Sequence, residues 1–259
     1  MSKNTFRILA AIAVSGLAAA IILYYLPDFH YAADKTLDLL IADTLIRVFA
    51  SFFLVLIVLS GREGAAFAIR GEGLGKKLLI ILPCFPVAIV NFPFSALITG
   101  SATVDKTNLV WLFVINCFFI AFVEEVFFRG LLQPIFYRIV KGKKFDVILS
   151  VLMTSAAFAA WHLVNLLSGA SVGATLLQVV YTFLLGCMFS FMIIETGSVW
   201  WCVLAHAIFD VGGRIIILLG SGSFQDTAFW ILTIVVGVLV GVYVFVMLMI
   251  RQKNDALKN

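Results

Sequence analysis

Long apolar runs alternate along this chain with short polar connections. Crossing a bilayer as a helix takes about 20 predominantly apolar residues, within a range of roughly 17–25. The runs that approach this length are 8–26, 37–60, 78–99, 109–134, 145–167, 174–194, 199–219 and 227–250. The pattern therefore predicts an all-α fold, a polytopic transmembrane bundle of about eight helices, with residues 1–259 forming one integral membrane domain.

Local features modify three of these spans. The run 8–26 follows two basic residues, as a signal peptide would, but it exceeds the 7–15 apolar residues of a signal peptide, so we predict an uncleaved helix. In the second span, Asp43 and Arg47 are four residues apart and are expected to pair along one helical face. The third span, 78–99, contains three prolines, which lack the amide hydrogen that a helix needs. We predict that it is kinked or broken.

Composition strengthens the membrane prediction. The chain is 63% hydrophobic and 12% charged, against averages of roughly 45–50% and about 25% in soluble domains. Most Lys and Arg lie in the termini and in the connections 61–77 and 138–144, whereas the opposite loops hold only Lys35 and Lys106. This asymmetry predicts a multi-pass protein of the cell membrane with both termini in the cytoplasm. The net charge of +4 is modest and gives no indication of a nucleic-acid partner.

One apolar segment, 119–134 (FIAFVEEVFFRGLLQP), contains Glu124, Glu125 and Arg129. Each ionisable group at bilayer depth costs at least ~2.5–3.5 kcal/mol, so such groups are retained for function. Helical spacing puts Glu125 and Arg129 on one face about a turn apart, where they neutralise each other. Glu124 lies about 100° further round the helix and is left to act chemically.

Two later spans add histidines at helical spacing. Phe158 precedes His162 by four residues, and His206 precedes Asp210 by four, with Arg214 one turn further on. Hydrolysis needs a group that deprotonates water and donors for the oxyanion, and carboxylates and histidines supply both. Chains of the same groups also form proton relays in transporters. From the residues alone, a hydrolase, a proton-coupled transporter and a non-catalytic membrane scaffold all remain open.

Other hydrolytic layouts fit less well. The chain contains no HExxH helix and no GxSxG elbow. Zinc held by His162, His206 and a carboxylate is chemically feasible, but the sequence has no helical His-x₃-His clamp. The four cysteines lie in apolar runs without CxxC spacing and are interpreted as small buried hydrophobes. We therefore expect neither a metal nor a cofactor.

Taken together, the motifs resemble a known family. They are EExxxR at Glu124 to Arg129, FxxxH at Phe158 to His162, and HxxxD at His206 to Asp210. The family is the CPBP (CAAX protease and bacteriocin-processing, or Abi) intramembrane glutamic endopeptidases, which includes the type II CAAX prenyl endopeptidases. The resemblance covers about 108–219, the predicted motif-bearing catalytic core.

This resemblance implies a role for each motif residue. Glu124 with His162 would activate the attacking water, and His206 with Asp210 would stabilise the oxyanion in an intramembrane catalytic cavity. The last motif ends here in Asp rather than Asn, and an ionised carboxylate cannot donate a hydrogen bond. We therefore expect Asp210 to orient His206, which then donates.

The remaining motif residues, Glu125, Arg129 and Phe158, would support the site. The substrate implied is a peptide or protein, cleaved in bacteriocin maturation or self-immunity or in the processing of membrane proteins. Prenylated substrates belong to the eukaryotic branch of the family, and this small chain with basic loops is interpreted as bacterial, so prenyl specificity is not carried over.

Overall fold

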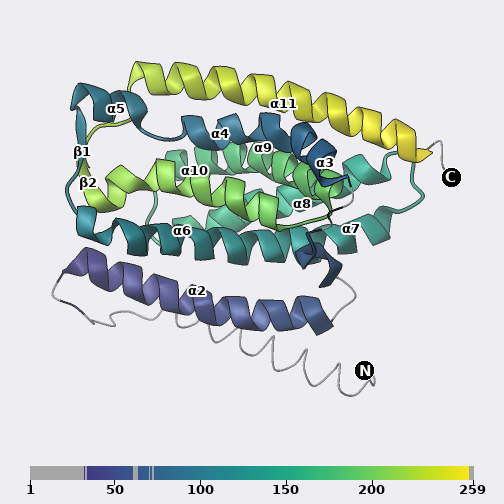
Figure 1. Cartoon of the computed structure of the whole chain (residues 1–259), viewed down its shortest axis with the longest axis horizontal. Coiled ribbons are helices and arrows are strands. Elements are labelled where there is room, and N and C mark those ends of the chain that lie inside the picture. Colours follow the sequence, from purple (N-terminus) through teal and green to yellow (C-terminus); the bar gives the residue numbers. More distant parts are fainter. Residues whose placement is uncertain (1–31, 33, 61–63, 70, 72, 257–259) are drawn as a thin grey trace. The chain divides into compact units, whose positions relative to one another are not determined.

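The computed structural model describes residues 32, 34–60, 64–69, 71 and 73–256, and it is almost entirely helical (Figure 1). Within that part of the chain, six helices are long and apolar enough to cross a membrane. They are Lys35–Ser60, Thr107–Val140, Asp146–Leu166, Val172–Thr196, Trp200–Leu219 and Thr227–Asn254. The predicted helical, multi-pass fold is confirmed. The predicted span 8–26 lies outside the described residues.

Five helices begin and end within a few residues of the predicted spans. They are α2 (Lys35–Ser60), α8 (Asp146–Trp161, continued by the 3₁₀ turn η5, His162–Leu166), α9 (Val172–Thr196), α10 (Trp200–Leu219) and α11 (Thr227–Ala256). Ser171 caps α9 by accepting a hydrogen bond from the Ala174 amide at 3.2 Å. Gly197 ends the same helix in the left-handed region at φ 70°.

The third predicted span is broken, as its prolines indicate. The segments are α3 (Leu74–Ile81), η2 (Leu82–Cys84), α4 (Phe85–Val90) and α5 (Phe94–Thr99). Pro83 lies in the 3₁₀ turn, Pro86 in the first turn of α4, and Pro93 directly precedes α5. Each proline thus lies at or next to a helix end, where the missing amide hydrogen costs least.

The fourth span differs from a regular helix. It consists of η3 (Thr107–Leu109), α6 (Val110–Glu125), η4 (Val126–Leu132) and α7 (Gln133–Val140), and η4 is a π-helix. Backbone hydrogen bonds in a π-helix join residues five apart rather than four, and such segments are frequent at functional sites. Glu124 and Glu125 still lie on α6, so the angle of about 100° between them holds. The alignment expected for Glu125 and Arg129 assumed α-helical geometry, which ends at Glu125.

The described chain divides into two compact units. The first contains the described residues up to Gly64, with Phe85–Val126 and Val203–Gly237; the second contains Ala65–Cys84, Phe127–Cys202 and the described residues from Val238 onward. In the first unit, α2 packs along α6, and the core between helices includes Leu40, Phe113, Cys117, Ile216 and Leu219.

A partly buried polar contact also joins α2 to α6 in the first unit. Arg47 Nε donates to both oxygens of Asp43 at 3.0 Å, so the pairing expected from their spacing is confirmed. Asn116 of α6 donates to Asp43 Oδ2 at 2.8 Å and to Thr44 Oγ1 at 3.1 Å. An otherwise costly charge pair inside an apolar helix is thereby held by a neighbouring helix.

Two short strands, which the hydropathy pattern does not predict, close one end of the first unit. β1 (Ala102–Val104) pairs antiparallel with β2 (Gly220–Gly222), with Ala102 opposite Gly222. Gly222 has φ 95°, and a side chain there would overlap the carbonyl oxygen of Ser101, so only glycine fits. The hydroxyl of Thr103 donates to Asp105 at 2.7 Å and holds the pKa of that carboxyl below its usual range.

An ion pair lies at the same end, before α2. Lys106 Nζ contacts the two carboxylate oxygens of Asp34 at 2.7 and 3.0 Å, and this bond lowers the pKa of Asp34. We expect Lys106→Met to raise the pKa of Asp34 in a carboxyl ¹³C NMR titration, with Lys35→Met as the control that removes a neighbouring cation. Because the folded pKa is depressed, the pair stabilises the fold above the usual aspartate pKa and loses that effect as pH falls through the depressed value. An unchanged titration of Asp34 in Lys106→Met would contradict this.

In the second unit, α8 packs against α7 and α9. Gly186 of α9 permits the close approach, because a Cβ there would lie 2.9 Å from that of Ser155 on α8. Gln252 of α11 accepts a hydrogen bond from the Val147 amide at 3.0 Å and donates to Asp146 at 3.1 Å. The last turns of α11 thus cap the first turn of α8.

Candidate functional site

The two adjacent glutamates end α6 and differ in their surroundings. The Glu125 side chain is 0% exposed, whereas that of Glu124 is 14% exposed. Successive residues of an α-helix point about 100° apart, so one carboxylate can be enclosed while its neighbour is reached by solvent or substrate. The two adjacent carboxylates therefore have different access to solvent.

His206 of α10 lies among three carboxylates. Its Nδ1 is 2.7 Å from Glu125 Oε1, a short hydrogen bond. Its Nε2 is 3.8 Å from Glu124 Oε2 and 3.7 Å from Asp210 Oδ1, too far for direct hydrogen bonds. Groups this far apart interact through a water or another bridging group. Both ring nitrogens face carboxylate oxygens, and only the imidazolium form offers a proton to each.

The structure thus brings Glu124, Glu125, His206 and Asp210 together in the first unit. Glu125 is a direct hydrogen-bond partner of His206, whereas the sequence predicted that Glu125 pairs with Arg129 and supports the site. Asp210 lies one turn along the same helix, at the ring's other nitrogen. The sequence signal for the Glu125 contact was weak, because a contact between two helices depends on how each is rotated about its axis.

The second unit holds the other motif residues. Arg129 is fully buried, and its guanidinium carbon lies 4.3 Å from the ring centre of Phe158 and 5.2 Å from that of Phe189. Stacking of this kind stabilises a buried guanidinium. His162 Nδ1 is 2.9 Å from the Phe158 carbonyl oxygen, and the rings of Phe158 and His162 meet edge to face.

Phe158 therefore contacts both the arginine of the first motif and the histidine of the second. Two expected contacts, Glu124 with His162 and Glu125 with Arg129, join residues of different units and stay predictions. Among the described residues, no group of three or more His, Cys, Asp or Glu is arranged to hold a metal ion.

The fold and site thus define a multi-pass helical membrane protein in which a buried histidine lies among three carboxylates. Residues 106–212 match the model of the family described as type II CAAX prenyl endopeptidase Rce1-like. The match contains all three motifs and confirms the resemblance read from them. It points to a membrane peptidase, a hydrolase that acts on peptides or proteins. No curated protein and no solved structure gives a significant match.

Proposed function

We propose that the protein is an intramembrane endopeptidase in which Glu124 is the general base that activates water. The observation that carries the proposal is the contrast within the glutamate pair. Glu125 is enclosed and hydrogen-bonded to His206, whereas the carboxylate of Glu124 is partly exposed and makes no hydrogen bond within the described part of the chain. A base must have such an accessible, unoccupied carboxylate to accept a proton from water.

The chemistry follows from these positions. Water attacks the carbonyl carbon of the scissile peptide bond as Glu124 takes its proton, and the carbonyl oxygen becomes an oxyanion. His206 Nε2 is close to Glu124, so an N–H there can donate to that oxyanion. The C–N bond then breaks, and Glu124 returns the proton to the departing amine. The products are a carboxylic acid and an amine, and the base is regenerated.

The other residues of the cluster serve His206. The short bond from Nδ1 to Glu125 fixes the plane of the ring, and Asp210 lies at the nitrogen that faces the reaction. By the family resemblance, His162 helps to hold the water. Suitable substrates are peptides or membrane proteins, and bacteriocin maturation or self-immunity and membrane-protein processing are the roles we favour.

Peptide hydrolysis by the purified, detergent-solubilised protein tests the proposal. We expect the full-length chain to cleave members of a random peptide library, with products identified by mass spectrometry, and a boiled sample to cleave none. The competing function is a proton-coupled transporter, since the same cluster would also relay protons. That alternative predicts flux driven by a pH gradient in proteoliposomes without cleavage, and this result would overturn the proposal. A scaffold would show neither activity.

A further inference from the structure

The break between α4 and α5 is anchored to α10 beside the candidate site, within the first unit. Asn91 lies in this break and is buried. Its side-chain amide donates to the carbonyl oxygen of Phe209 at 2.7 Å. Phe209 directly precedes Asp210 and lies three residues after His206. The bond therefore holds the helical turn that carries both residues.

Two consecutive glycines allow this approach. A Cβ on Gly212 would lie 2.8 Å from the backbone of Asn91 and Phe92. One on Gly213 would lie 2.6 Å from Asn91 Nδ2. Contacts under 3.0 Å force atoms to move: a larger residue at Gly212 would displace the backbone of the break, and one at Gly213 would displace the Asn91 side-chain amide. Glycine destabilises the middle of a helix relative to alanine, which makes two in succession costly unless close packing requires them.

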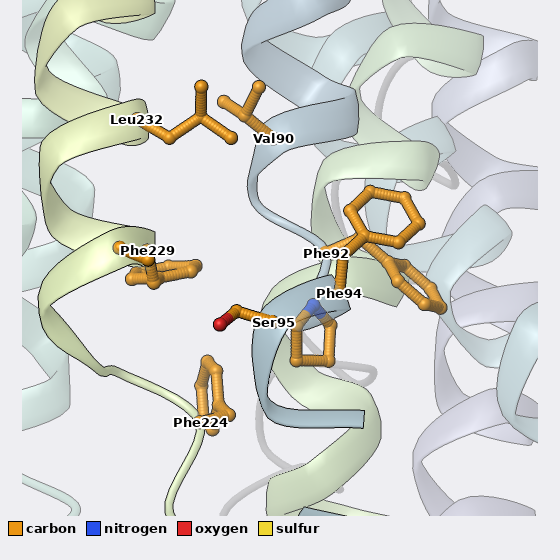
Figure 2. Close-up of a pocket in the computed structure, with 9 residues that line it drawn as sticks. Val90, Phe92, Phe94, Ser95, Phe224, Phe229 and Leu232 are labelled. Atoms are coloured by element: carbon orange, nitrogen blue, oxygen red, sulfur yellow. The ribbon is translucent and has the colours of Figure 1, made fainter. Parts of the chain in front are cut away.

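The break also faces the region around the start of α11. A cavity of about 60 Å³ lies there, lined from the break by Val90, Phe92 and Ser95 and from the region around the start of α11 by Phe224, Phe229 and Leu232 (Figure 2). The break contacts α10 through one hydrogen bond and two glycines.

We propose that Asn91, with Gly212 and Gly213, is a positioning device for the candidate site. By fixing the turn from His206 to Asp210, it holds the His206 ring at its distances from Glu124, Glu125 and Asp210. Asn91 touches no reacting atom and acts only through α10. The catalytic readout of this proposal rests on the proposed peptidase function, whereas the placement of His206 does not.

Pairs of variants distinguish the effect of the Asn91–Phe209 hydrogen bond from the effect of general packing. The Cβ that Gly213→Ala adds overlaps a side-chain atom of Asn91, so the additional substitution Asn91→Ala should remove this overlap. Gly212→Ala overlaps backbone, and Asn91→Ala should not relieve it. Gly237→Ala in α11 is the matched control, because among the described residues no atom lies within 4 Å of its Cβ position.

We expect Gly213→Ala to lower kcat by about 10- to 100-fold with little change in KM, the effect of a misplaced group at a reacting centre. The double variant Asn91→Ala/Gly213→Ala should recover to the level of Asn91→Ala alone, while Gly237→Ala should keep the wild-type kcat. A readout that does not need activity is NMR of full-length protein labelled with ¹⁵N-histidine. The chain has 3 histidines, and loss of a signal in His206→Gln assigns the ring.

In these spectra, Asn91→Ala and Gly213→Ala should shift the His206 ring signals, and Gly237→Ala should not. The proposal is overturned if Asn91→Ala leaves both kcat and the His206 signals at their wild-type values. It is also overturned if the double variant Asn91→Ala/Gly213→Ala has neither a higher kcat nor a higher yield of folded protein than Gly213→Ala. If the wild-type protein cleaves no peptide, the peptidase function fails, and the His206 spectra still decide the positioning role.

Discussion

We expect Glu124→Gln to lower kcat for peptide hydrolysis by about 10²- to 10⁴-fold, the usual contribution of a general base. Glutamine keeps the size and polarity of the side chain but cannot take a proton from water. The Glu124 carboxylate makes no hydrogen bond within the described residues and is partly exposed, so the fold should keep its thermal stability. Initial cleavage rates and thermal unfolding of the purified variant measure the two effects.

The matched control for this prediction is Glu195→Gln. Glu195 is also a carboxylate near the end of a membrane helix, 3.9 Å from Arg251, but it lies in the second unit and outside the three motifs. We expect this variant to keep the wild-type kcat. Full activity in Glu124→Gln would refute the assignment of the base, whatever the control shows.

Glu125→Ala lowers the free energy of unfolding by about 3–5 kcal/mol, the typical cost of removing one partner from a buried charged pair. The variant leaves His206 Nδ1 buried without the acceptor that lies 2.7 Å away in the wild type. Glu125→Gln keeps an oxygen that can accept from Nδ1–H, so its loss should be clearly smaller. Denaturant unfolding in detergent measures the difference.

Activity distinguishes this role from that of the neighbouring glutamate. Because Glu125 fixes the His206 ring, Glu125→Gln should retain measurable cleavage, unlike Glu124→Gln. Equal stability of Glu125→Ala and the wild type would show that the short contact contributes nothing to the fold. Equal kinetic defects in the two glutamine variants would show that the pair acts as a unit.

Much of the fold follows from the sequence because the bilayer sets the length of each apolar run. The ends of α9 and α10, and the break around Pro83 and Pro93, follow from local residues alone. The pairing of β1 with β2 does not, since it joins residues 118 apart in the chain, such as Thr103 and Ser221. The π-helix also lacks a local signal, because its residues have the same apolar character as those of an α-helix.

In the candidate site, too, local spacing could be predicted from the sequence, whereas contacts between helices could not. The spacing of His206 and Asp210 predicts that both lie on one helix face, and the helical angle predicts that the two glutamates point in different directions; their burial differs. The bond from Glu125 to His206 depends on the rotation of α6 against α10, which no local pattern encodes. The contact of Asn91 with Phe209 was missed for the same reason.

The π-turn between α6 and α7 has a consequence for the register of this membrane span. In one continuous α-helix, the direction in which each residue faces is fixed by every residue before it. A π-helix holds more residues in each turn than an α-helix, so the residues after it face directions offset from those of an unbroken α-helix. Glu125, on one side, faces His206, while Gln133, on the other, donates to the Ser190 carbonyl oxygen at 3.2 Å. One membrane span can thereby direct Glu125 to His206 and Gln133 to Ser190. An unbroken α-helix could do so only if both partners lay in the directions that its regular spacing gives.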